Sequence, residues 1–320
     1  MSNDFKYTPA QVGEVAMTLA KGAFQLASLV TRYGPDEFTS GRGDTVFLNV
    51  PGVLTASSRA LDDVTTSIVL DSLSEREEPI KLATHAISAV GLSEKDLSLD
   101  LVDFGRQVLA PQTDAVVDKI ESAIERVLAG LPVTDADYSA SDPIALFSAA
   151  RRELRNRGID VAAEKLVAIV GGNVVDALFD SGALDFDKTG SADALRDGSL
   201  GRIRGFEAVE SGKVAADEVV FMTTGALYLA SRAPKVPEGA PFGQIVNAGG
   251  FSLRYLRDYD PMHTQDRSVV STFVGAGVMP LYKVNRTPES GKQGDTGYAR
   301  STVSLDSVTG GAVVKFDTAA

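Results

Sequence analysis

The feature that most constrains the fold is a long helical pattern at residues 96–129. Apolar side chains such as Val116, Ile120 and Ile124 share one face of this pattern, and acidic side chains occupy the other faces. Pro111 lies inside the pattern, where a proline removes one backbone hydrogen bond and clashes with the preceding turn. The sequence therefore predicts one long helix that is kinked or broken near Pro111.

A second helical pattern begins at Thr8 and stops at Gly34. Thr8 suits the N-cap, Pro9 suits the first helical position, and Gln11 completes a capping box. Residues 1–40 are therefore predicted to form a helical arm.

Residues 41–90 have the pattern of a long β-hairpin. Segments 46–50, 64–70 and 80–84 are rich in β-branched residues, and a charged turn is expected at 75–79. Because two or three strands need another surface to pack on, we expect this hairpin to project and to find a partner.

The middle of the chain, residues 142–240, alternates between helical and strand patterns and predicts a mixed α/β domain. A turn-rich stretch at 233–239 is expected to mark its boundary. Two strands, 251–259 and 268–282, are predicted after that boundary. Within the domain, helices are expected between Pro143 and Gly158 and at 173–180, with strands at 165–170, 204–210 and 218–223; weak strand signals follow at 301–305 and 312–316.

Composition excludes several classes of function. Of the 320 residues, 44% are apolar and 23% are charged, which is typical of a folded chain, and no apolar run is long enough to cross a bilayer. A net charge of −12 disfavours sequence-reading nucleic-acid binding. With no cysteine and two histidines, His85 and His263, the chain offers no thiolate site and no recognisable catalytic triad. We therefore expect no catalytic residue, no cofactor and no metal.

Three short motifs have plainer interpretations than the sites they resemble. Gly171-Gly172 lies between a strand and a helix, but the stretch lacks the third glycine of a dinucleotide fingerprint. Asp185 and Asp187 begin a calcium-loop pattern that fails at its twelfth position, Arg196. The tripeptide that starts at Arg42 is expected to be a simple turn.

Taken together, a series of weak motifs resembles the tailed-bacteriophage major capsid proteins of the Johnson, or Hong Kong 97-like, fold. The resemblance covers about residues 8–282 and is nearest to the coat proteins of short-tailed Salmonella phages. The motifs are the arm ending near Tyr33, then Gly43-Asp44-Thr45-Val46, Phe104-Gly105-Arg106-Gln107-Val108-Leu109-Ala110-Pro111, Ala149-Ala150-Arg151-Arg152-Glu153-Leu154, Gly201-Arg202-Ile203-Arg204-Gly205-Phe206 and Tyr255-Leu256-Arg257-Asp258-Tyr259-Asp260.

The resemblance implies an α+β subunit with six parts. They are an N-terminal arm at 1–40, an extended β-hairpin loop at 41–90, a peripheral domain with a kinked spine helix at 91–141, an axial domain at 142–240, returning peripheral strands at 241–282, and a tail at 283–320 with no family match.

The implied function is self-assembly through pentamers and hexamers into the icosahedral head of a tailed phage. The implied partners are further copies of the chain, a portal, a decoration protein and packaged double-stranded DNA without sequence-specific contact, with no membrane. Because the arm starts at Thr8, leaving no room for a built-in scaffolding segment, a separate scaffolding protein is expected. The protein would assemble in the host cytoplasm and reside in the virion.

Two alternatives remain open at this point. An encapsulin-like nanocompartment shell would share the fold, and a soluble α/β enzyme would use the Gly171 turn to bind a phosphate. Charged residues expected to pair between subunits are Asp44, Arg76, Glu77 and Glu78 on the hairpin and Arg254, Arg257, Asp258 and Asp260 on a returning strand. The alternative that each is simply solvated stays open, because exposed pairs contribute little.

Overall fold

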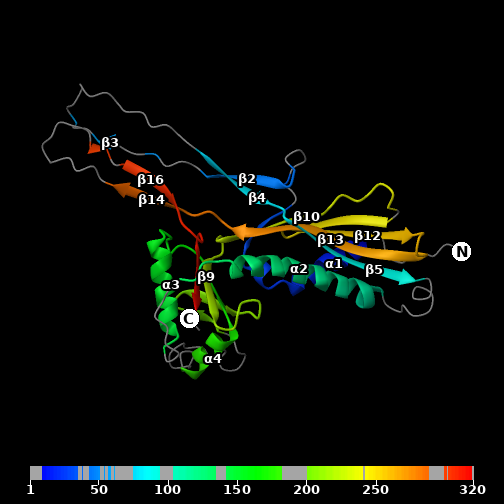
Figure 1. Ribbon diagram of the computed structural model, residues 1–320, viewed down its shortest axis with the longest axis horizontal. Helices are drawn as coiled ribbons and strands as arrows, with labels where there is room; N and C mark the ends of the chain where they lie inside the picture. Colours follow the sequence, from blue (N-terminus) through cyan, green and yellow to red (C-terminus); the bar gives the residue numbers. More distant parts are fainter. Residues whose placement is uncertain are drawn as a thin grey trace.

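The computed structural model describes residues 9–34, 38, 43–50, 54, 57–58, 61, 75–93, 104–134, 142–181, 200–240, 242–287, 299–300 and 302–318. Figure 1 shows an elongated α+β molecule in which helix α2 (Ala110–Ala129) lies along a large sheet, and a smaller body lies below one end of that helix. Within these ranges, no helix is both long and apolar enough to cross a membrane.

The large sheet has six strands. The main order is β1 (Thr31–Tyr33), β10 (Leu227–Arg232), β13 (Gln265–Val278), β12 (Phe251–Asp260) and β11 (Phe242–Ala248), and β5 (Thr84–Ser93) also pairs with β13. The predicted strands at 251–259 and 268–282 are confirmed in type. Strand β11 was missed, although its turn into β12 has a hairpin signal: Gly249 and Gly250 have φ of 63° and 81°, as a tight turn requires.

Helices α1 (Pro9–Ala23) and α2 cover one face of this sheet, with α1 against β11 and α2 against β13 and β5. The prediction that the first helix continues to Gly34 is wrong. It ends at Ala23, and a short 3-10 helix, η1 (Leu26–Ser28), leads into β1, which pairs in parallel with β10. The reason is tertiary: backbone N–H groups after the helix bond to the side chain of Glu121 instead of continuing the helical ladder. The described part of the predicted arm is therefore packed into the body.

The described part of the long helix runs from Phe104 to Ala129 and is not broken near Pro111. From Phe104 the chain passes through a π-helical stretch, η3 (Gly105–Leu109), directly into α2, and the Ala110 N–H bonds to the Gly105 carbonyl. Pro111 follows this wider turn, which accommodates the irregularity without ending the helix. A kink in the helix axis stays a prediction, and residues 96–103 lie outside the described part of the chain.

The smaller body contains a five-stranded sheet. Its order is β17 (Val313–Asp317), β9 (Glu218–Thr223), β6 (Leu166–Val170), β8 (Phe206–Glu210) and β7 (Arg202–Ile203). All five residues of β6 are buried because both faces of the sheet are covered. On one face Leu166, Ala168 and Val170 join the cluster of helices α3 (Ile144–Asn156) and α4 (Gly172–Asp180); on the other, Val167 and Ile169 join the cluster that contains the end of α2.

Two predicted boundaries are wrong. The turn-rich stretch at 233–239 connects β10 to β11 within the large sheet, so the 142–240 block includes one strand of the other body. The tail at 283–320 is not separate, because β17 pairs with β9 and completes the smaller sheet. The described strands of the tail agree in type with the weak signals at 301–305 and 312–316. Sheet membership depends on pairing between distant segments, which local patterns do not reveal.

Three further two-stranded sheets lie outside these two bodies and project on the same side (Figure 1). One pairs β2 (Thr45–Val50) with β4 (Arg76–Lys81), which confirms the start and return of the predicted hairpin; the predicted strand 64–70 lies outside the described residues. The charged stretch at 75–79 was expected to be a turn but mostly lies in β4. The second sheet pairs β14 (Tyr282–Thr287) with β16 (Thr302–Ser307). The third pairs β3 (Ser57–Ser58) with β15 (Ala299–Arg300).

Candidate assembly surface

The β2–β4 hairpin has one face toward the chain's own body. Residues at alternate positions of a strand share a face, so Arg76, Glu78 and Ile80 lie together. Ile80 is 2% exposed and packs in a small apolar cluster with Phe38 and Ala230. The base of the hairpin is therefore anchored to strand β10 of the large sheet.

Farther along this inner face, the hairpin contacts Tyr282, the first residue of β14. The Tyr282 hydroxyl donates a hydrogen bond to the Glu78 carboxylate, and the Arg76 guanidinium lies 5.4 Å from the centroid of the Tyr282 ring. The hydrogen bond to Glu78, followed by burial, raises the pKa of Tyr282. Together with the β3–β15 pairing, this contact joins the loop and the tail into one composite arm.

The opposite, outward face of the hairpin carries an aromatic ring and charges of both signs, with Glu77 along the strand and exposed Lys81 at its base. The register pairs Phe47 with Pro79 and Asn49 with Glu77, which places these residues on the same face. Phe47 is 44% exposed, and Glu77 is exposed. Within the described residues, the Glu77 side chain has no hydrogen-bond or ion-pair partner. An exposed aromatic side chain near the Glu77 carboxylate is a surface suited to contact another molecule.

Backbone contacts fix the angle at which the hairpin leaves the sheet. The Leu82 N–H bonds to the Asp44 carbonyl at 2.9 Å, and the Ala83 N–H bonds to the Val274 carbonyl at 3.0 Å. The chain crosses β13 so closely at this point that a Cβ on Gly275 would lie 1.8 Å from the Lys81 carbonyl oxygen. Asp44 lies at this base, where its carboxylate accepts a hydrogen bond from the Thr45 hydroxyl at 3.0 Å.

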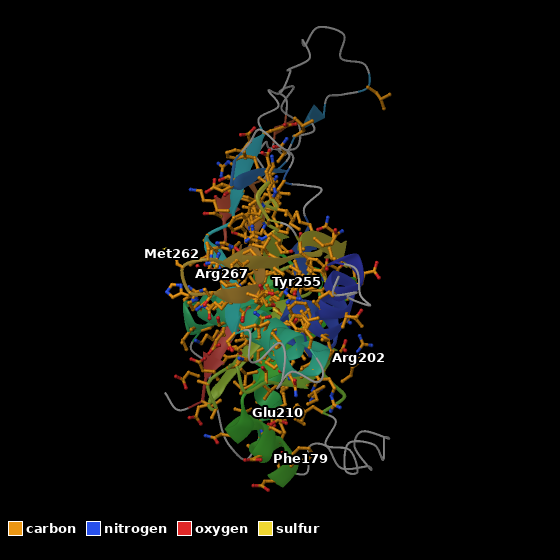
Figure 2. All side chains as sticks on the ribbon, turned by 90° about the vertical axis from the view of Figure 1, so that its right-hand side faces the viewer. Phe179, Arg202, Glu210, Tyr255, Met262 and Arg267 are labelled. Carbon is orange, nitrogen blue, oxygen red and sulfur yellow. The ribbon has the colours of Figure 1, made fainter. Side chains whose placement is uncertain are left out.

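The second predicted group of charges lies at the far end of the large sheet and has partners within the chain. Arg257 pairs with Asp266 at 2.6 Å, and Arg267 pairs with Asp258 at 2.6 Å. Asp260 lies 3.9 Å from Arg267 and 2.9 Å from His263. The hydrogen bond with His263 is the largest cause of the lowered pKa of Asp260. Figure 2 shows Arg267 and Met262 near each other at this end.

Arg254 has a different environment from the rest of that group. Its Nε donates to Ser271 Oγ at 3.1 Å, and one terminal nitrogen donates to the Lys235 carbonyl at 2.8 Å. Burial lowers the pKa of Arg254. The structure therefore separates the eight predicted contact residues into a hairpin set and a sheet set. Sequence reasoning missed the cross-strand partners Asp266 and Arg267, which a two-residue periodicity across the 261–264 turn could have indicated. Contact between subunits stays a prediction for all eight.

The Gly171 turn does not have the form of a phosphate site. A Cβ on Gly171 would lie 2.2 Å from the Ala215 carbonyl oxygen, so the glycine allows a close approach by the chain's own backbone. The Asn173 N–H bonds to the Ala216 carbonyl at 3.0 Å, and the Asn173 side chain donates to the Asp217 carboxylate at 2.7 Å. Carbonyl oxygens and a carboxylate thus occupy the place where a helix N-terminus would receive an anion.

The other short motifs provide no site within the described residues. Asp185 and Asp187 lie outside them, as does Arg42, while Gly43 has the positive φ of a turn, 74°. The centroid of the His85 ring lies 4.6 Å from that of the Phe273 ring, with the rings tilted by 55°. Burial and then the positive charge of Arg254 lower the pKa of His85. In the part of the chain that the structure describes, no group of three or more acidic or histidine side chains is arranged to hold a metal.

Comparisons with known proteins relate this architecture to viral shells. No protein-family model matches the sequence, and no curated protein matches it. A protein of Mycobacterium phage Che8 superposes with a TM-score of 0.60 at 17% identity, over 92% of this chain and 91% of that chain. The capsid of cyanophage P-SCSP1u gives 0.56 at 14% identity, over 78% and 83%. The mature capsid of bacteriophage PhiM1 gives 0.52 at 12% identity, over 87% and 82%.

The structure therefore defines a class: the chain has a fold found in phage capsids. At these identities the likeness concerns the fold. The nearer resemblance to coat proteins of Salmonella phages stays a prediction.

Proposed function

We propose that this chain is the major capsid protein of a tailed phage, a shell subunit whose activity is self-assembly. The observation that carries the proposal is the composite arm: a hairpin anchored on one face and exposed on the other, projecting from a body whose fold occurs in phage capsids. The large sheet with α2 would be the peripheral domain, and the smaller body would be the axial domain near the centre of each capsomer.

Assembly by such a subunit depends on repetition. Each contact between neighbours is weak, but a closed symmetric shell repeats it many times, so the whole is stable although each pair is not. Pentamers and hexamers of the chain would build an icosahedral head around double-stranded DNA. A separate scaffolding protein, a portal and a decoration protein are the further proposed partners. The hairpin set and the sheet set of charged residues would set the register between subunits.

The test is purification of the chain, alone and with its scaffolding protein, followed by analytical sedimentation and negative-stain microscopy. We expect shells of uniform size with the scaffold present. Phe47→Glu should abolish shells while leaving the circular dichroism unchanged, and Phe47→Leu should retain them. A monomer under all conditions would contradict the proposal. Shells filled with an enzyme instead of DNA would identify a nanocompartment.

A further inference from the structure

A cleft of about 460 Å³ lies where the base of the β2–β4 hairpin meets the large sheet. Its volume is within the range of sites that bind small organic molecules, about 300–1,000 Å³. Four separate segments of the chain line it: Gly43–Asp44, Leu82–His85, Arg232–Lys235 and Phe273. The cleft is therefore a candidate small-molecule site.

Three of the lining side chains form a row across neighbouring strands. Phe273 of β13 pairs in register with His85 of β5 on one side and with Arg232 of β10 on the other. The next residue, Val274, is buried in the core under the helices, so Phe273 lies on the opposite face of the sheet. The centroids of the Phe273 and His85 rings are 4.6 Å apart. The row thus offers an aromatic surface with a cation at one end.

Positive charge gathers around this row, in a chain whose net charge is −12. The Arg232 and Lys235 side chains line the cleft, and neither has a hydrogen-bond or ion-pair partner among the described residues. Arg254 lies close enough to lower the pKa of His85, so a third positive charge acts on the cleft while the imidazole stays neutral. Exposed Lys81, next to the lining segment, adds a fourth.

Carboxylates oppose this charge at two places. Asp44 lines the cleft on the hairpin side, is exposed and accepts a hydrogen bond from the Thr45 hydroxyl. Glu238, also exposed, follows Lys235 by three residues and lies outside the lining. Four cations thus face two carboxylates, and the cleft has both a cationic side and one acceptor, Asp44, for a hydrogen-bond donor.

The walls of the cleft are held in place without any ligand. On the sheet side, the Ala233 N–H donates to Ser252 Oγ at 2.9 Å. On the hairpin side, the Leu82 N–H donates to the Asp44 carbonyl at 2.9 Å. A preorganised site loses little conformational freedom when it binds, so modest contacts are sufficient.

We infer that this cleft binds a nucleoside monophosphate, with the base against Phe273 and the phosphate held by Arg232 and Lys235. The exocyclic amino group of the base donates to the Asp44 carboxylate. Each part of the ligand has its counterpart: aromatic side chains stack on bases, guanidinium and ammonium groups bind phosphate, and carboxylates accept hydrogen bonds from base amino groups. The inference goes beyond the proposed function and does not depend on assembly.

The test is calorimetric titration of the full-length, unassembled chain with 5′-GMP. We expect a dissociation constant below about 1 mM, and binding of ribose 5-phosphate, which lacks the base, at least about tenfold weaker. Arg232→Gln with Lys235→Gln should weaken GMP binding at least about tenfold. The matched control, Lys119→Gln with Arg155→Gln, removes the same charges from exposed positions on α2 and α3 and should leave the affinity unchanged.

Two further variants separate the roles of the ring and the carboxylate. Phe273→Leu should weaken the binding of GMP and leave that of ribose 5-phosphate unchanged, with circular dichroism confirming the fold. The unmodified chain should prefer GMP to 5′-UMP, whose base has no amino group, and Asp44→Ala should remove that preference.

Three results would overturn the inference. The first is no GMP binding up to about 10 mM, and the second is equal binding of GMP and ribose 5-phosphate, which would indicate attraction of any anion. The third is tighter binding of a single-stranded decanucleotide than of GMP, lost in the Arg232 and Lys235 variant, which would assign the cleft to a nucleic-acid strand. None of them bears on the proposed function, because shell formation is measured separately by sedimentation and microscopy.

Discussion

The carboxylate of Glu121 accepts a hydrogen bond from the backbone N–H of Leu26 at 3.0 Å, between residues 95 positions apart in the chain. Its other oxygen accepts the N–H groups of Gln25 at 3.0 Å and Ala27 at 3.1 Å. Glu121 is only 3% exposed. One side chain of the long helix therefore ends α1 and holds the turn that leads into β1.

Replacing this carboxylate with an amide should destabilise the fold. In Glu121→Gln the amide NH2 faces N–H donors, leaving at least one of them without an acceptor, which should lower the free energy of unfolding by about 1–3 kcal/mol. Urea denaturation measures the change. Glu125→Gln, a less buried site on the same helix, is the control and should change stability by less than about 0.5 kcal/mol. Equal effects at the two positions would contradict the assigned role.

Lys315 should connect the long helix to the smaller sheet. Its ammonium lies 2.7 Å from the Glu218 carboxylate and 3.4 Å from the carbonyls of Leu128 and Ala129 at the end of α2, and its side chain is 4% exposed. Lys315→Met leaves a partly buried carboxylate unpaired and should lower the free energy of unfolding by about 2–4 kcal/mol. Adding Glu218→Gln should recover part of that loss. A double variant as unstable as the sum of the single variants would show that the pair does not interact.

Gly275 should be intolerant of any side chain. A Cβ there would meet the Lys81 carbonyl oxygen at 1.8 Å, and both groups belong to paired backbone that cannot shift independently. Gly275→Ala should lower the melting temperature by an amount equivalent to about 1–3 kcal/mol and change the hydrogen exchange of the hairpin base. Gly212→Ala, where nothing lies within 4 Å of the added atom, is the control. Unchanged exchange at Leu82 and Ala83 would contradict the role of this crossing.

The titration of His85 should depend on Arg254. Burial and then the charge of Arg254 lower the pKa of His85, so the folded state favours the neutral imidazole. The contribution of neutral His85 to the stability of the fold is therefore fully present above the ordinary histidine pKa of about 6.5. It is lost as pH falls below that value and through the lowered pKa of the folded state. Arg254→Gln should raise the pKa of His85 in an NMR titration, and Arg155→Gln should leave it unchanged. A further decrease in Arg254→Gln would exclude the electrostatic explanation.

Local patterns predicted the elements of this fold better than their partners. The apolar stripe around Val116 and Ile120 identified the long helix, and the β-branched segment at 46–50 identified the hairpin, because helix and strand periodicity are properties of neighbouring residues. The end of α1 was missed because it depends on Glu121, far along the chain. The place of β17 was missed for the same reason: nothing near Val313 indicates that β9 is its neighbour.

The candidate surface was predicted in part. Alternation along β4 indicates that Glu77 and Glu78 face opposite ways, but it cannot show that Glu78 meets Tyr282, which lies in the tail. A cleft at the base of the hairpin, lined by Arg232 and Lys235 among others, was not predicted at all. Its lining comes from four segments that only the tertiary fold brings together, and neither residue belongs to a recognisable motif.

The position of β17 has a consequence for how the subunit is made. Strand β17 is an edge strand of the five-stranded sheet, but it comes late in the chain. Strands β10 to β14 and β16, which belong to other sheets, are synthesised before it. A nascent chain that stops before residue 313 leaves β9 without one neighbour and lacks Lys315 beneath the long helix. Incomplete translation products therefore cannot finish the smaller sheet. Only a chain translated through β17 can therefore complete that body.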